Sequence, residues 1–168
     1  MIDEKKIHML QDRIEILDLL GRYCLTLDTD DLDGWVNCFT ENGTFGNDER
    51  ALVGHNKLRA YAEVHVQIGT RHVTSSPVYD MAENGLTATG VASTVVTVAT
   101  PKGFRVLMTG GYRDLLEKVD GSWLIAHRWV EFQHLPNDPA RDIPSHDPDV
   151  VELHHMLIDA FSRFSQPI

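Results

Sequence analysis

The sequence has few cysteines and no long hydrophobic run. Only Cys24 and Cys38 occur among 168 residues, and both have apolar neighbours, which is typical of reduced thiols in a core. Disulfide frameworks belong to oxidising compartments, so we expect a cytoplasmic protein. No apolar stretch approaches the ~20 residues of a membrane span, and the first residues lack the apolar segment of a secretory signal. We therefore expect no membrane partner.

Positive charge is also scarce. Lysine and arginine total 15 against 25 aspartates and glutamates, which gives a formal net charge of −10. Nucleic acids and anionic membranes both attract basic patches, so this balance argues against nucleic acid as a partner. The nine histidines show no metal-binding spacing such as H-x-H or H-E-x-x-H, and no glycine-rich phosphate loop occurs. We therefore expect neither a metal nor an organic cofactor.

The length and the apolar content fit one core. Apolar residues make up 42 % of the chain, and a chain of this length buries roughly 70 % of its unfolded surface. We therefore expect one domain over residues 1–168, with a core of about 5–133. Four prolines between residues 135 and 148 predict a loop there, and the apolar spacing over 149–164 predicts a final helix.

The first half of the chain has helical periodicity. Spacing of three and four predicts a helix over residues 5–29, a short helix over 35–39 capped by Asp33, and a third helix over about 57–68. Aspartates, glutamates and arginines occupy the other side of the first helix, including Asp12. Its expected buried stripe consists of Ile7, Leu10, Ile14, Leu17, Leu20, Cys24 and Leu27.

The second half has the alternation of strands. A short strand is expected at 44–46, and long strands are expected over 71–79, 87–99, 104–118 and 123–133. Short turn signals separate the long strands, so we expect antiparallel neighbours. The pair Gly110-Gly111 is expected to form a bulge. Helices first and strands later predict an α+β fold, with helices on one face of a curved antiparallel sheet.

Asp28 lies at the end of the first helix. At 100° per residue it lies almost directly over Leu10 and about 20° from Leu17. A carboxylate there is expected either to have a partner or to line a cavity, and the alternative is a solvated residue where the helix frays. Tyr23 lies about 140° from Asp28, so both reach one cavity only if the sheet surrounds the helix end.

His72 lies at the start of the first long strand, where alternation places it on one face with Thr74 and Ser76. A histidine on the face that meets the helices can pair with a carboxylate. The alternative is a histidine that faces solvent or is satisfied locally.

Arg128 lies in the last strand and shares a face with Leu124, Ala126 and Val130 by alternation. An arginine among apolar residues needs an anion or a carboxylate partner. The alternative is an ion pair at the rim of the sheet. One bulge in this strand would exchange the face of Arg128 with that of His127.

The order of these features resembles the SnoaL-like family of the nuclear transport factor 2-like superfamily. That superfamily includes scytalone dehydratase, bile-acid 7α-dehydratase and hexachlorocyclohexane dehydrochlorinase. The resemblance implies a cone-shaped α+β barrel, in which N-terminal helices pack inside a strongly curved sheet around a deep pocket. The matching segments are the helix end at 23–28, Asp33-Gly34-Trp35, residues 39–45, Gly54, Arg71-His72, residues 111–114, residues 120–123 and His127-Arg128.

The resemblance also implies a site. Asp28 would orient His72 as a general base, Tyr23 would donate a hydrogen bond, and Arg128 would stabilise a leaving group or anion. The implied function is a cofactor-independent dehydratase-type lyase that acts on a hydrophobic, cyclic, hydroxylated small molecule. An isomerase or a polyketide cyclase is the first alternative. The second is a non-catalytic binding or assembly module, in which Asp28 and His72 would not touch.

The final helix has its own apolar face, formed by Leu153, Leu157, Phe161 and Phe164. This face either closes the mouth of the cone or packs against a neighbouring subunit. Exposed apolar surface on an open sheet predicts a homo-oligomer, and the resemblance favours a trimer over a dimer.

Overall fold

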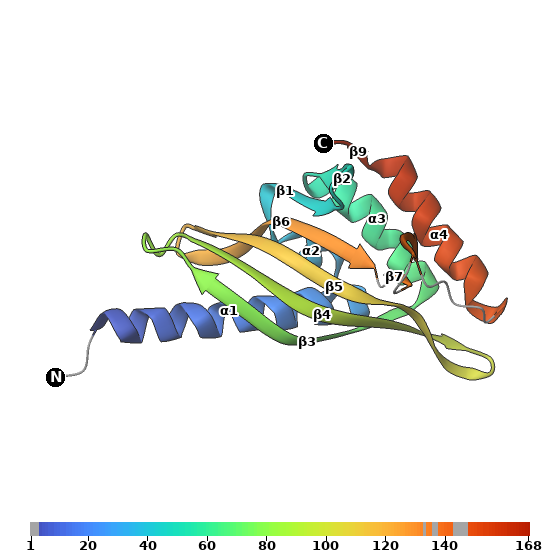
Figure 1. The fold of residues 1–168 in the computed structure, drawn as a ribbon, viewed down its shortest axis with the longest axis horizontal. Helices are drawn as coiled ribbons and strands as arrows, with labels where there is room; N and C mark the ends of the chain where they lie inside the picture. The colour runs from blue at the N-terminus through green and yellow to red at the C-terminus, as the bar shows by residue number, and fades with distance from the viewer. Residues whose placement is uncertain (1–3, 133, 136–137, 143–147) are drawn as a thin grey trace.

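The computed structural model describes residues 4–132, 134–135, 138–142 and 148–168 (Figure 1). Its helices are α1 (Glu4–Asp28), α2 (Leu32–Val36), α3 (His55–Ile68) and α4 (Pro148–Phe164). Its strands are β1 (Phe39–Gly46), β2 (Arg50–Val53), β3 (Thr70–Met81), β4 (Thr87–Thr100), β5 (Gly103–Val119), β6 (Ser122–Phe132), β7 (His134–Leu135), β8 (Asp138–Asp142) and β9 (Gln166–Pro167).

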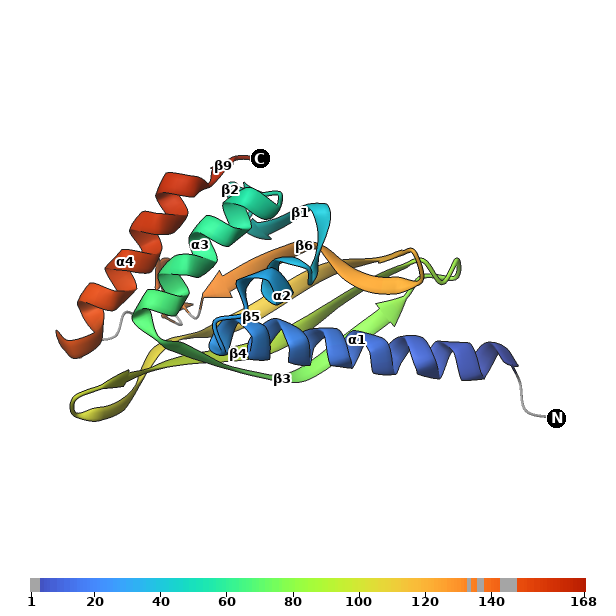
Figure 2. The ribbon, with the colours of Figure 1, turned by 180° about the vertical axis from the view of Figure 1, so that it is seen from behind.

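One curved, unclosed sheet holds most of the strands, in the order β3-β4-β5-β6-β1-β2-β9. The helices pack on its concave side, as Figures 1 and 2 show from opposite directions. The α+β fold predicted from the sequence is therefore confirmed, and β3 to β6 are antiparallel neighbours. The sheet is not antiparallel throughout, because β1 pairs in parallel with β6. That pairing joins distant parts of the chain, so no turn signal announces it.

The buried face of α1 differs from the expected one. Ile7, Leu10, Ile14 and Leu17 are 39 to 61 % exposed. Leu20 and Leu27 are buried as expected, but the other buried residues of α1 are Asp12, Ile16, Leu19 and Tyr23. Asp12 is buried because its carboxylate accepts hydrogen bonds from Lys118 Nζ and, at 3.0 Å, from Trp123 Nε1. Asp12 therefore forms a salt bridge with Lys118, although periodicity alone placed it on the polar outer face of α1.

Three other segments differ in detail. The short second helix begins at Leu32, and its cap is Asp31 rather than Asp33, because the Asp31 carboxylate accepts from Gly34 N at 2.9 Å. The predicted loop at 135–148 includes the pair β7–β8, whereas its residues 136–137 and 143–147 lie outside the described residues. The final helix lies where it was expected and packs on α3, with the rings of Tyr61 and Phe161 6.1 Å apart.

The bulges lie elsewhere than predicted. Gly110 and Gly111 pair regularly with β6, and Gly110 is required because a Cβ there would lie 2.1 Å from the carbonyl oxygen of Glu131. Extra residues lie at Leu107 in β5 and Ala126 in β6, and the register of β3 against β4 also shifts between Ser75 and Val78. The bulge at Ala126 puts Arg128 on the concave face with Ile125, not on the face of Leu124 as simple alternation predicts.

Candidate functional site

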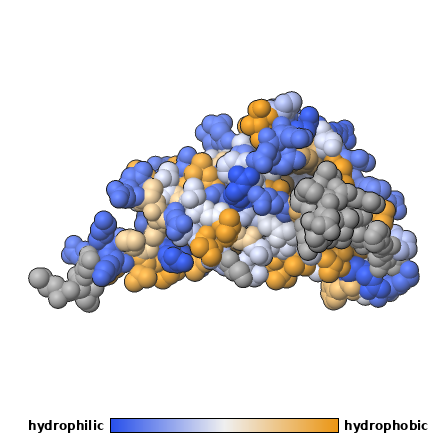
Figure 3. Space-filling view, in the orientation of Figure 1, coloured by the Kyte–Doolittle hydropathy of each residue, from blue (hydrophilic) through white to orange (hydrophobic). Residues whose placement is uncertain are grey.

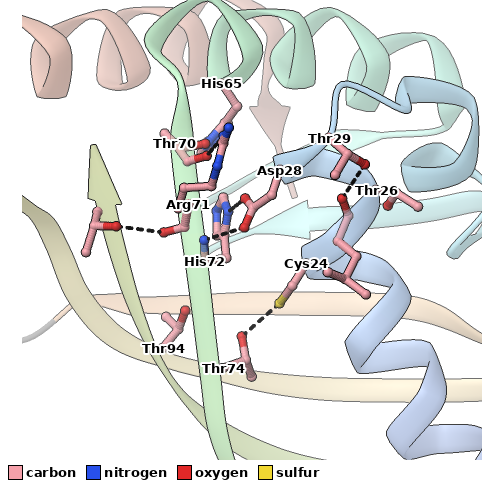
Figure 4. Close-up of polar contacts among 12 residues, drawn as sticks. Cys24, Thr26, Asp28, Thr29, His65, Thr70, Arg71, His72, Thr74 and Thr94 are labelled. Carbon is pink, nitrogen blue, oxygen red and sulfur yellow. Dashed lines mark hydrogen bonds and ion pairs between the residues drawn. The ribbon is translucent and has the colours of Figure 1, made fainter. Parts of the chain in front are cut away.

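The end of α1 meets the start of β3, and there Asp28 and His72 point toward each other (Figure 4). His72 Nδ1 lies 2.7 Å from Asp28 Oδ1, and the backbone N–H of His72 donates to Asp28 Oδ2 at 2.8 Å. The two side chains are 2 % and 13 % exposed, His72 being the more buried. Because both carboxylate oxygens bind one residue, the imidazole is fixed by its Nδ1 edge.

The ends of α1 and α3 bring Asp28 and His72 together. α1 stops at Asp28 because Asp30, two residues on, adopts φ 64°, and the side-chain hydroxyl of Thr29 donates back to the Leu25 carbonyl. α3 stops at Gly69, whose φ of 72° lets its N–H bond the carbonyls of His65 and Val66. β3 then starts at once, so His72 is carried to the concave face beside the end of α1. Its neighbours Arg71 and Val73 are exposed, as alternation predicts.

His65 lies against His72 and was not anticipated from the sequence. Its ring is 5.4 Å from that of His72, and its Nδ1 lies 3.1 Å from Thr70 Oγ1. Burial, and then the nearby His72, hold the pKa of His65 well below its ordinary value, so this ring is neutral at neutral pH. The signal for it was the three-four spacing that places His65 with Leu58, Tyr61 and Ile68 on the buried face of α3.

An open groove of about 360 Å³ runs between α1 and β3 and reaches His72. Its wall is mainly apolar, with two polar side chains in contact, since Cys24 Sγ and Thr74 Oγ1 are 3.3 Å apart (Figure 4). The groove therefore suits a largely hydrophobic small molecule. It is lined by Leu17, Leu20, Gly21, Cys24, Leu25, His72, Val73, Thr74 and Pro77.

Both cysteines are free and neither has the environment of a nucleophile. Burial raises the pKa of the Cys24 thiol, and burial raises the pKa of Cys38 to about 11. The thiol form therefore dominates at neutral pH, and thiolate chemistry is disfavoured.

Arg128 has its carboxylate partner inside the protein and not at the rim of the sheet. Its Nε and Nη2 donate to the two oxygens of Asp114, each at 2.8 Å, and both side chains are fully buried. Tyr79 donates its hydroxyl to the same carboxylate at 2.6 Å. Burial alone would lower the pKa of Arg128, but Asp114 raises it well above its ordinary value, so the charge is permanent. Arg128 Nη1 has no hydrogen-bond partner within the described part of the chain.

Tyr23 packs against the guanidinium group of Arg128. The Tyr23 and Tyr112 rings lie 4.1 and 4.2 Å from the guanidinium carbon of Arg128. Burial, and then the neighbouring Tyr112, raise the pKa of Tyr23 well above its ordinary value, so its hydroxyl stays protonated. The four predicted site residues thus form two pairs: Asp28 with His72 at the groove, and Tyr23 with Arg128, neither of which lines the groove.

A family model for a SnoaL-like domain matches residues 8–129. The chain belongs to the SnoaL-like family. This assignment confirms the resemblance noted from the sequence. No curated protein matches the sequence. A protein of unknown function from Mycobacterium tuberculosis is 38 % identical, with 99 % of this chain and 96 % of that chain covered and a TM-score of 0.88.

Two further structures share the fold of this SnoaL-like chain, both from Novosphingobium aromaticivorans. One is a nuclear transport factor 2-like protein with a cystatin-like fold, 19 % identical, with 83 % of this chain and 96 % of that chain covered and a TM-score of 0.74. The other is a proposed scytalone dehydratase, 18 % identical, with 76 % and 88 % covered and a TM-score of 0.68.

Two features bear on what the SnoaL-like chain can bind. Within the described ranges, no three histidine, cysteine, aspartate or glutamate side chains are grouped closely enough to hold a metal ion. Among the helices of those same ranges, none is both long and apolar enough to cross a membrane. The side chains of the site themselves offer one oriented imidazole, one buried guanidinium and several protonated hydroxyls.

Proposed function

We propose that this protein is a lyase of the dehydratase type, which removes water from a hydrophobic, cyclic, hydroxylated small molecule and needs no cofactor. The observation that carries the proposal is the contact of Asp28 Oδ1 with His72 Nδ1 at 2.7 Å, next to an apolar groove. An imidazole held in this way is poised as a general base, and the groove has the size and polarity for such a substrate.

His72 supplies the base. Because its Nδ1–H donates to Asp28, the lone pair resides on Nε2. Nε2 removes a proton from the carbon next to a substrate carbonyl, and the C–H electron pair forms the new double bond as the neighbouring C–O bond breaks. The protonated His72 then returns its proton to the departing hydroxyl, which leaves as water. The negative charge of Asp28 stabilises the imidazolium between these two transfers.

Arg128 and Tyr23 supply hydrogen-bond donors beyond the groove. Arg128 has its charge compensated by Asp114, yet its Nη1 is without a partner in the described residues. A buried donor of this kind gains most from an oxygen that acquires negative charge during the reaction. Tyr23 keeps its proton because burial raises its pKa. We assign Arg128 and Tyr23 as hydrogen-bond donors to the substrate oxygens. Cys24 and Thr74 form the polar part of the groove wall that the substrate contacts.

The fold neighbours are consistent with this assignment, since one of them is a proposed scytalone dehydratase. One observation favours a second candidate, an isomerase or polyketide cyclase in the same pocket. The strand segment 91–96 reads Val-Ala-Ser-Thr-Val-Val and has no carboxylate to act as a separate acid. A proton shift or a ring closure needs no acid for a departing hydroxyl, whereas in the elimination His72 has to supply that proton itself.

Product analysis separates the candidates. The purified protein is incubated with a panel of hydroxylated cyclic ketones, and the products are analysed by mass spectrometry. Loss of one water that disappears in His72→Gln and is retained in His155→Gln, which replaces an exposed histidine, supports the lyase. A product of unchanged mass supports the isomerase. Tight binding of panel members with no product, in wild type and both variants, supports a binding module and overturns the proposal.

A further inference from the structure

The outer side of α1 carries an apolar stripe that no part of the described chain covers. We use the name α1 stripe for Ile7, Leu10, Ile14 and Leu17, which are 39, 61, 59 and 45 % exposed. Hydrophobic side chains gather at this end of the molecule in the space-filling view (Figure 3). Exposed apolar residues spaced so regularly along one helix are typical of an interface.

The start of α1 stands away from the body of the protein. Its residues 4–11 are all exposed, and the first side chain anchored to the sheet is Asp12, bound by Lys118 and Trp123. Figures 1 and 2 both show this end of α1 projecting beyond the strands. A short, fully exposed helical segment is marginal in water, so this segment is expected to gain stability from another surface.

The α1 stripe also points in a direction that a partner can reach. On a helix at 100° per residue, its centre lies roughly 150° around from the buried face that carries Ile16 and Tyr23. The buried face therefore lies on one side of α1 and the stripe faces away from it, except that Leu17, the last residue of the stripe, also lines the groove beside β3. A second helix can lie along the stripe without displacing any strand.

The spacing and the flanking charges select the kind of partner. The stripe has the three-four-three spacing of a coiled-coil seam, with isoleucine and leucine alternating. Arg13 flanks the seam on one side and Asp18 on the other, five residues later, and both are exposed. In a parallel, in-register pair of such helices, each Arg13 meets the Asp18 of the partner. In an antiparallel pair, arginine would face arginine and aspartate would face aspartate, which is unfavourable.

We propose that the α1 stripe pairs, parallel and in register, with the α1 stripe of a second copy of this chain. Isoleucine and leucine in alternate seam positions favour a two-stranded arrangement. The two bodies then lie on opposite sides of the seam, which ends at Leu17, where the groove that reaches His72 begins. The proposal does not depend on the reaction that the protein catalyses.

Molar mass in solution tests the pairing. Light scattering after size exclusion is expected to give twice 18.9 kDa for the wild type, and about one chain mass for Leu10→Asp and Ile14→Asp. Phe104→Asp is the matched control, because Phe104 is 75 % exposed near the start of β5, away from α1, and this variant should keep the double mass. Circular dichroism verifies that all variants are folded. A wild-type monomer, a mass of three chains, or a double mass unaffected by both α1 variants overturns the proposal.

Charge reversal and cross-linking test the direction. Arg13→Glu and Asp18→Arg should each raise the dissociation constant of the pair several-fold, and the double variant should restore it. Leu10→Cys and Ile14→Cys should each form a disulfide between identical positions under mild oxidation, whereas the wild type, with Cys38 buried and Cys24 partly buried, should not. Cross-links formed at only one of the two positions, or charge variants without effect, would rule out the parallel arrangement.

Discussion

Asp28 accepts two hydrogen bonds from the same residue, one from the backbone N–H of His72 and one from its ring Nδ1, at 2.8 and 2.7 Å. The first bond joins the end of α1 to the start of β3, and the second fixes the imidazole. A single carboxylate thus couples the local fold to the orientation of the proposed base. Changes at Asp28 should therefore separate into a structural part, which depends on the acceptor oxygens, and a functional part, which depends on the charge.

We expect His72→Gln to lower kcat by about 10²–10⁴-fold, the usual contribution of a general base. Asp28→Asn should lower kcat by about 10²-fold with little loss of stability, because its amide oxygen still accepts one of the two hydrogen bonds. Asp28→Ala leaves two donors without an acceptor, so it should cost about 1–3 kcal/mol of unfolding free energy as well. Turnover and urea denaturation measure the two parts. Equal activity of Asp28→Asn and wild type would contradict the role of the charge.

The pair of Arg128 and Asp114 should behave as a buried ion pair. Arg128→Met leaves the Asp114 carboxylate, which lies in a fully buried position, without its cation, and we expect a loss of about 3–5 kcal/mol in unfolding free energy. The double variant Arg128→Met/Asp114→Leu removes both charges and should recover most of that loss. The four proteins form a double-mutant cycle measured by urea denaturation. Additive effects of the two single changes would show that the contact contributes no coupling.

Much of the fold could be predicted because its signals are local. The long strands alternate with period two and end at short turns, and the final helix has clear three-four spacing. The first four residues of the predicted face of α1, from Ile7 to Leu17, were wrong because the helix has apolar residues on two sides, and periodicity does not say which side meets the sheet. The side that meets the sheet is the one that carries Asp12, whose burial depends on Lys118 and Trp123 far along the chain. The pairing of β1 with β6 is equally non-local.

The residues of the site also differ in how well the sequence predicts their contacts. Alternation put His72 on the inner face, and the family resemblance suggested Asp28 as its partner. Arg128 reached the interior only through the bulge at Ala126, which no residue pattern marked. Asp114 follows from the register of β5 against β6, and His65 from the packing of α3 beside β3. Such contacts depend on the tertiary structure. The sequence therefore indicates which residues are functional candidates more readily than it indicates which residues they contact.

The buried His65 should make the protein less stable in mild acid. Its pKa is held well below the ordinary value in the folded state, so below about pH 6.5 the unfolded chain binds a proton that the folded chain does not. Stability is therefore fully present above that pH and decreases as the pH falls, by up to about 1.4 kcal/mol per pH unit from this residue. Urea denaturation of wild type and His65→Gln at pH 7.5 to 5 should show their difference shrinking in this way.

The control for that experiment is His155→Gln, which replaces an exposed histidine on α4. Its difference from wild type should stay constant over the same pH range. A difference between wild type and His65→Gln that is also constant would contradict a role of His65 in acid sensitivity. It would then be necessary to attribute any loss of stability in acid to another group.

Replacing Gly21 by alanine should increase stability and weaken substrate binding in the groove. It lies inside α1, where glycine costs about 0.5–1 kcal/mol relative to alanine, and a Cβ added to it would meet no atom within 4 Å. Gly21→Ala should therefore raise the unfolding free energy by that amount. The same methyl group projects into the groove beside Cys24 and Leu17, so it should raise KM for a substrate that fills this space.

A second glycine gives the contrast that makes this test sharp. A Cβ on Gly90 would lie 2.4 Å from the carbonyl oxygen of Val78, so Gly90→Ala should destabilise the β3–β4 pair. Denaturation and steady-state kinetics of both variants distinguish space kept for a ligand from space needed by the fold. If Gly21→Ala is more stable and its KM is unchanged, the substrate does not occupy this part of the groove.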